Sequence, residues 1–112
     1  MTAKKTTTIE AQSSVLTLIN VYEVEPERQA ELASLLAEAT ETVMRRQPGF
    51  ISVSIHVSLD GSRVVNYAQW ASKEDFERLM QNPEAQAQIK KFAQIAKSVA
   101  PALYRVCSVH VR

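Results

Sequence analysis

The sequence has few of the residues that the common cofactor and metal sites need. It contains two glycines, Gly49 and Gly61, so it has no glycine-rich loop for the phosphates of a flavin or nicotinamide cofactor. Its two histidines, His56 and His110, are far apart in the chain and do not form a metal-binding pair. We therefore expect a protein that uses no flavin, nicotinamide or metal cofactor.

The sequence also has a single cysteine, a net charge of only +1 and no long apolar run. The single cysteine, Cys107, excludes an internal disulfide, and its apolar neighbours favour a buried, unreactive thiol. Thirteen Lys and Arg residues balance twelve Asp and Glu residues, which disfavours nucleic-acid binding. No run could span a membrane, and residues 1–14 lack the apolar core of a signal peptide. We expect a cytoplasmic protein with a flexible tail at residues 1–14 and one domain at residues 15–112.

The first half of that domain predicts a strand, a helix and a hairpin. Residues 15–24 are apolar and β-branched, as in a buried strand. Apolar residues spaced by three and four predict a helix over residues 26–46, which Pro48-Gly49 ends. Strict alternation predicts a strand over residues 50–59, Asp60-Gly61 is a turn signal, and residues 63–70 form the returning strand.

The second half predicts two helical segments and a last strand. Ser72 to Asp75 form a capping box at the start of one helix. Asn82-Pro83 starts the next segment, which extends through Val99 until Pro101 stops it. Residues 103–111 form the last strand.

The predicted order is β-α-β-β-α-β, which is the ferredoxin-like arrangement of the α+β class. It places a four-stranded antiparallel sheet under helices that cover only one face. The other face is partly apolar and needs a cover, so we expect a homodimer formed through the open sheet face.

One stretch of the third predicted strand, residues 66–70 (NYAQW), could carry chemistry. The two-residue period places Asn66 and Trp70 on the same face. Asparagine is a poor strand former and needs hydrogen-bond partners when it is buried. From periodicity alone, the favoured interpretation is structural, with Trp70 as a core anchor and Asn66 as a satisfied polar group.

The hairpin formed by residues 56–70 (HVSLDGSRVVNYAQW) resembles the same hairpin in antibiotic biosynthesis monooxygenases of the dimeric αβ-barrel superfamily. It is most similar to the small anthrone oxygenases of aromatic polyketide pathways. The segments at residues 47–50 (QPGF) and 72–76 (SKEDF) resemble the neighbouring turn and helix start of that family. The resemblance covers about residues 15–111 and implies the same fold.

The resemblance also implies roles for individual residues. Residues that match Asn66 and Trp70 line a pocket between sheet and helices in the anthrone oxygenases, where they position a polycyclic phenol or the oxygen species. The chain departs from the family at two positions, with Phe76 in place of a tyrosine and Lys90 in place of an arginine. Phe76 lacks the hydroxyl group, and Lys90 lacks the planar fork of arginine. Lys90 lies beside Lys91, which favours a solvated position.

A second branch of the superfamily degrades haem, and it matches this chain poorly. Its first-strand asparagine corresponds to Asn20, which could line a pocket or bond to neighbouring groups. Its tryptophan and histidine correspond to Leu79 and Ile89, so no iron ligand remains. The sequence therefore disfavours haem degradation.

His56 is a candidate general base by its intrinsic pKa, but its position depends on the hairpin register. A two-residue Asp60-Gly61 loop pairs Ile55 with Asn66 and places His56 on the opposite face of the sheet. A three-residue loop pairs His56 with Asn66. The sequence leaves both registers open.

These observations support two main hypotheses. The first is a cofactor-independent monooxygenase that oxidises an electron-rich aromatic substrate (an anthrone, phenol or quinol) to a quinone with dioxygen. Asn66 and Trp70 would then be its catalytic residues, and Asn20, Phe76, Lys90 and His56 would bind substrate. The second is a non-catalytic dimeric protein that binds a small aromatic ligand, favoured by the missing hydroxyl at Phe76. An RNA-binding domain comes last, because Tyr22 and Tyr67 are its only candidate exposed strand aromatics.

Overall fold

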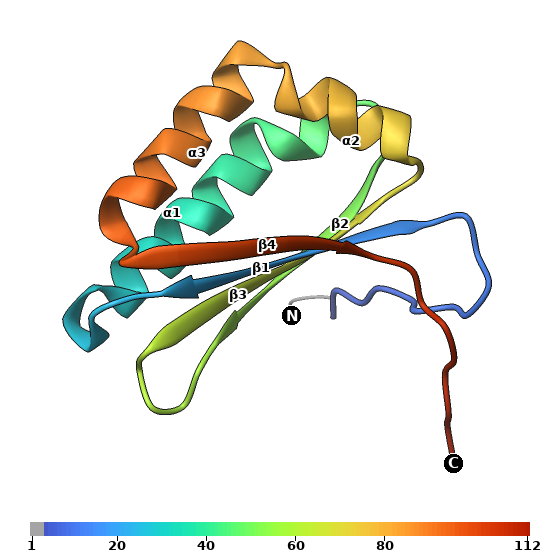
Figure 1. The fold of residues 1–112 in the computed structure, drawn as a ribbon, viewed down its shortest axis with the longest axis horizontal. Helices are drawn as coiled ribbons and strands as arrows, with labels where there is room; N and C mark the ends of the chain where they lie inside the picture. Colours follow the sequence, from blue (N-terminus) through green and yellow to red (C-terminus); the bar gives the residue numbers. More distant parts are fainter. Residues whose placement is uncertain (1–3) are drawn as a thin grey trace.

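The computed structural model describes residues 4–112 and confirms the predicted α+β, ferredoxin-like fold (Figure 1). Strands β1 (Leu16–Glu23), β2 (Phe50–Val57), β3 (Arg63–Trp70) and β4 (Ser98–Tyr104) form one antiparallel sheet in the order β2-β3-β1-β4. Helices α1 (Gln29–Thr42), α2 (Lys73–Met80) and α3 (Pro83–Ile95) cover one face of it. Within residues 4–112, no helix combines the length and the apolar character needed to cross a membrane.

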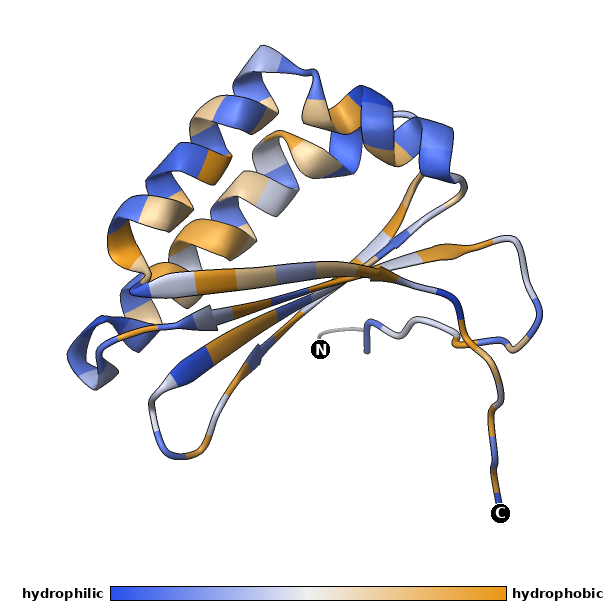
Figure 2. Cartoon of the chain, in the orientation of Figure 1, coloured by the Kyte–Doolittle hydropathy of each residue, from blue (hydrophilic) through white to orange (hydrophobic). Residues whose placement is uncertain are grey.

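The core lies between the helices and the sheet, because both layers have one apolar side. Hydrophobic and hydrophilic residues alternate along the strands, and each helix shows both kinds (Figure 2). Leu32, Leu36 and Ala39 of α1 are buried against alternate residues of β1 and β3. The predicted first helix is divided, since 3₁₀ turns η1 (Pro26–Arg28) and η2 (Met44–Arg46) flank α1.

The helix starts that follow β3 were predicted correctly. The Asp75 backbone N–H donates to Ser72 Oγ at 3.1 Å, and the Ala85 N–H donates to Asn82 Oδ1 at 3.0 Å. Each cap satisfies a donor that the first turn of a helix leaves unpaired. Together they fix where α2 and α3 begin, and so how both helices lie over the sheet.

The β2–β3 turn settles the hairpin register. Asp60 accepts hydrogen bonds from the Ser62 N–H at 2.9 Å and the Ser62 hydroxyl at 2.7 Å, which lowers the pKa of Asp60 to about 2. Ile55 pairs with Asn66, and His56 pairs with Val65. This is the register of the two-residue-loop alternative, so His56 lies on the sheet face away from the helices.

The alternation predicted for residues 50–59 fails at both ends. A β-bulge between Phe50 and Ser52 shifts the register, so that Phe50 pairs with Trp70 and Ile51 is 44% exposed. Strand β2 ends at Val57, and Leu59 lies fully exposed in the turn. The two apolar residues at the ends of this alternation, Ile51 and Leu59, are therefore on the surface.

The C-terminal prediction was also wrong in its boundaries. Helix α3 ends at Ile95, and both Val99 and Pro101 belong to β4. A proline normally breaks a strand, but β4 is an edge strand that pairs only with β1, and there a missing N–H is tolerated. Strand β4 ends at Tyr104, and Cys107 beyond it is exposed rather than buried.

The terminal segments lie on the sheet face away from the helices (Figure 1). Residues 4–14 form no helix or strand, but they bond to buried Gln69 of β3. The Thr7 hydroxyl donates to Gln69 Oε1 at 2.7 Å, and Gln69 Nε2 donates to the Thr8 carbonyl at 2.9 Å. These contacts involve the outer face, and the site described next lies on the other face.

Candidate functional site

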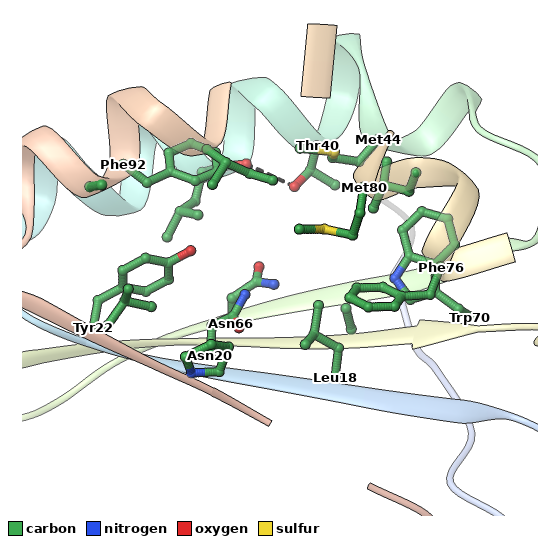
Figure 3. Close-up of a pocket in the computed structure, with 17 residues that line it drawn as sticks. Leu18, Asn20, Tyr22, Thr40, Met44, Asn66, Trp70, Phe76, Met80 and Phe92 are labelled. Carbon is green, nitrogen blue, oxygen red and sulfur yellow. Dashed lines mark hydrogen bonds between the residues drawn. The ribbon is translucent and has the colours of Figure 1, made fainter. Parts of the chain in front are cut away.

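A pocket with a cavity of about 190 Å³ lies between the sheet and the helices (Figure 3). Strands β1, β3 and β4 form its floor, and α1, η2, α2 and α3 form its roof. Most of its lining is apolar, as is typical of sites for small organic ligands. The lining residues that carry polar side-chain atoms are Asn20, Tyr22, Thr40, Asn66 and Trp70.

Two asparagines meet at the centre of the floor. Asn20 of β1 pairs directly with Asn66 of β3, and both side chains point toward the helices. Asn66 is 9% exposed, and within residues 4–112 no protein hydrogen bond satisfies its amide. A buried amide without a partner is costly. It is therefore available to a bound ligand, which the structural interpretation of Asn66 did not anticipate.

Trp70 stands at one end of the pocket, beside Phe76. Its side chain is 1% exposed and packs edge-on against Phe50, with ring centroids 5.6 Å apart. Its Nε1–H has no hydrogen-bond partner in the described part of the chain. Buried indole N–H groups usually find an acceptor, so this donor can serve a ligand oxygen.

The helices that form the roof contribute mainly apolar side chains to the pocket. The lining includes Phe76, Leu79 and Met80 of α2 and Ile89 and Phe92 of α3. The Thr40 hydroxyl already donates to the Leu36 carbonyl at 2.8 Å. The polar groups left free to meet a ligand are therefore those of the sheet.

Tyr22 is a pocket residue that the sequence analysis missed. It lies at the end of the floor opposite Trp70, with its hydroxyl toward the cavity (Figure 3). It was considered only as an exposed strand aromatic, yet it is 5% exposed and faces the helices. Burial raises the pKa of Tyr22 to about 12, and the neighbouring Asn20 side chain offsets a smaller part of the rise. The signal was available in the two-residue spacing that puts Leu18, Asn20 and Tyr22 on one face.

Two predicted site residues lie outside this pocket. His56 is on the opposite sheet face, as the register requires, and it is exposed. Lys90 is an exposed residue of α3, whose Ile89 and Phe92 face the cavity instead. The lining therefore contains no carboxylate, imidazole, amine or guanidinium group, and Tyr22 is its one ionisable side chain. In residues 4–112, no three His, Cys, Asp or Glu residues are grouped as a metal site would require.

The fold and the pocket define a class: a ferredoxin-like α+β domain with an apolar ligand site between sheet and helices. Residues 15–91 match the family model described as antibiotic biosynthesis monooxygenase. The chain belongs to the antibiotic biosynthesis monooxygenase family. This confirms the resemblance, and with it the prediction of an enzyme of the monooxygenase type.

One curated relative and two solved structures illustrate the similarity. The chain is 46% identical to the tetracenomycin-F1 monooxygenase of Streptomyces glaucescens over 79 residues. This matched region covers 70% of each protein. A monooxygenase from the ActVA-Orf6 gene of Streptomyces coelicolor, solved with nanaomycin D, superposes with a TM-score of 0.80 at 22% identity, over 87% of this chain and 91% of the other. SnoaB of Streptomyces nogalater, a cofactor-independent oxygenase, superposes with a TM-score of 0.78 at 20% identity. The superposition covers 87% of this chain and 97% of SnoaB. At these identities the two structures support the fold alone.

Proposed function

We propose that the chain oxidises an electron-rich aromatic substrate, an anthrone or a phenol, to a quinone with dioxygen and without a cofactor. The observation that carries this proposal is the apolar pocket, into which the Asn66 amide points and in which the Trp70 N–H has no hydrogen-bond partner among residues 4–112. The curated relative adds support, since it is named a tetracenomycin-F1 monooxygenase.

The reaction starts with loss of a proton from the phenolic or enolic hydroxyl of the substrate. The lining offers no charged base, and exposed lining residues such as Met80 and Val99 leave the pocket in contact with solvent, so the proton leaves to water. The resulting anion needs hydrogen-bond donors where its charge lies. The amide NH₂ of Asn66 and the Nε1–H of Trp70 supply them, while apolar walls exclude most bulk water.

The anion then transfers one electron to dioxygen, which gives superoxide and a substrate radical. The two combine to form a C–O bond at the ring carbon opposite the oxygen, and the product is a hydroperoxide. Loss of the remaining hydrogen from that carbon and cleavage of the O–O bond leave a carbonyl group and release water. Overall, one CH₂ group of an anthrone and one O₂ become one C=O group and one H₂O, so atoms and electrons balance.

The remaining substrate contacts follow from the lining. Asn20 lies opposite Asn66 and can hydrogen-bond a second substrate oxygen, and Phe76 provides an aromatic surface for ring stacking. His56 and Lys90 have no role in this proposal, because both lie outside the pocket. His56 is on the outer face of the sheet, and Lys90 is on the exposed surface of α3.

A homodimer belongs to the same proposal. The register puts Ile19 and Val21 of β1 next to Val65 and Tyr67 of β3 on the face away from the helices. A second copy packed on this apolar patch would give the two-sheet arrangement of the dimeric αβ-barrel class. Sedimentation of the full chain at micromolar concentration tests this, and a monomer would refute the dimer.

The decisive experiment is oxygen uptake by purified, metal-stripped protein with a panel of anthrones and phenols. Asn66→Ala and Trp70→Phe should each abolish uptake above the spontaneous rate, while His56→Ala and Lys90→Ala should retain it. Circular dichroism checks that every variant is folded. Uptake that survives both pocket substitutions would refute the proposed site. Binding without uptake in the wild type would favour the second candidate, a non-catalytic aromatic-binding protein.

A further inference from the structure

Tyr22 supplies a polar group at the end of the pocket that the proposed reaction does not use. Tyr22 pairs with Val64 across the β1–β3 ladder, and Trp70 lies six residues further along β3. At about 3.3 Å per residue, the backbones of Tyr22 and Trp70 are roughly 20 Å apart along the strand direction. The Asn20–Asn66 pair lies between them, so polar groups occur at both ends and the middle of the floor (Figure 3).

The Tyr22 ring is fixed by packing rather than by its hydroxyl. It meets Phe92 edge to face, with ring centroids 6.3 Å apart and an interplanar angle of 83°. A phenylalanine would make the same contact, so the hydroxyl is not needed for the core. A hydroxyl buried among apolar groups is costly unless it finds a partner. The neighbouring Asn20 side chain lowers the pKa of Tyr22, as an amide N–H donated to the phenol oxygen does, and such a bond leaves the O–H proton free to point into the cavity.

The ionisation state of Tyr22 suits a donor. Burial raises the pKa of this phenol to about 12, so at neutral pH it keeps its proton. A neutral O–H can donate to a carbonyl or phenolate oxygen but adds no charge to the pocket. An aromatic ligand with an oxygen only at the Trp70 end would leave this donor unpaired.

We infer that Tyr22 is a specificity-determining residue, whose hydroxyl donates a hydrogen bond to an oxygen at the ring end remote from Trp70. This inference rests on the proposed function, because it assumes that the pocket holds a planar aromatic substrate. It narrows the substrate class to fused-ring aromatics that carry oxygen functions at both ends of their long axis. Compounds that lack the second oxygen bind more weakly.

Ligand binding tests the inference without turnover. The ligands are 2-hydroxyanthraquinone and 2,6-dihydroxyanthraquinone, which differ by one hydroxyl at the far ring end. Binding is followed by quenching of Trp70, the single tryptophan of the chain. Wild type should bind the dihydroxy compound roughly 3- to 10-fold more tightly, the value of one neutral hydrogen bond. Tyr22→Phe should remove that preference and leave the affinity for the monohydroxy compound unchanged.

Tyr67→Phe is the matched control, because it deletes the same atom from a tyrosine on the outer face of the same sheet. It should keep the wild-type preference. A Tyr22→Phe protein that keeps the preference, or that loses affinity for both ligands equally, would overturn the inference, as would binding of neither ligand. Oxygen uptake on anthrones is measured separately. Uptake without a Tyr22-dependent preference defeats the inference alone, and a Tyr22-dependent preference without uptake defeats only the proposed reaction.

Discussion

Replacing Asn66 with leucine should make the protein more stable and inactive at the same time. The two side chains are similar in size, so the change removes polar atoms without opening a large void. Asn66 is 9% exposed and its amide has no protein partner within residues 4–112. An unpaired buried amide costs about 1–3 kcal/mol, and the low end applies here because water can reach the pocket. Leucine is also more favourable than asparagine in a strand.

The expected gain in the free energy of unfolding is therefore about 1 kcal/mol, which raises the Tm of a domain of this size by about 4–8 °C. Thermal unfolding followed by circular dichroism measures this, and oxygen uptake with an anthrone measures the loss of activity. Asn66→Leu should combine higher stability with lost activity, because Asn66 serves ligand binding and does not stabilise the fold.

Asn82→Ala is the control for this prediction. Asn82 is also partly buried, but its side chain accepts a hydrogen bond at 3.0 Å from the Ala85 N–H at the start of α3. Loss of such a cap costs about 1 kcal/mol, so its Tm should fall by several degrees. If Asn66→Leu lowers the Tm as Asn82→Ala does, then Asn66 is a structural polar group and the reasoning about its free amide is wrong.

Two further perturbations test the fold and the buried tyrosine. Gly49 has a φ of +82°, and a Cβ at this position would collide with the Asp75 side chain. Gly49→Ala should therefore lower the free energy of unfolding by about 2 kcal/mol or more, measured by urea denaturation. A stability equal to that of the wild type would contradict this geometry. The raised pKa of Tyr22 means that the folded state keeps a proton that the unfolded state loses, so its contribution to stability is complete below about pH 10 and is lost as pH rises toward 12. Absorbance titration of the three tyrosines should show one that ionises late, and this component should be absent in Tyr22→Phe; unchanged titration in that variant would refute the assignment.

The parts of the fold that were predictable are those governed by local chemistry. The capping residues Ser72 and Asn82 act over one helical turn, so the sequence alone places both helix starts. Apolar periodicity identified α1 and three of the four strands. The hairpin register remained open because a slip of one residue keeps every local preference satisfied. The closed turn around Asp60 settled it, through side-chain bonds that composition does not reveal.

The errors came from tertiary context. Pro101 was interpreted as the end of a helix because a proline seldom lies inside a strand. The structure accommodates it because β4 pairs on one side only. Alternation places Ile51 on the same strand face as Val53 and Ile55, but the bulge between Phe50 and Ser52 leaves Ile51 exposed. The pocket brings together Asn66 and Trp70, the pair that the resemblance placed in a pocket, with Asn20 and Phe76. Lys90 and His56 lie outside it because of the orientation of α3 and the β2 register. The alternation of β1 alone is enough to identify Tyr22 as a pocket residue, because it puts Tyr22 on the same face as Asn20.

Both outer strands of the sheet carry an interruption, and this affects how copies of the protein can associate. Pro101 removes a backbone donor from β4, and the bulge at Ile51 bends β2 at the other margin. Exposed edges with regular ladders are templates on which further chains add and grow into fibrous aggregates. Here neither margin offers an unbroken row of donors and acceptors. Extension of the sheet from chain to chain is therefore disfavoured, so the protein can be kept concentrated without strand-to-strand growth.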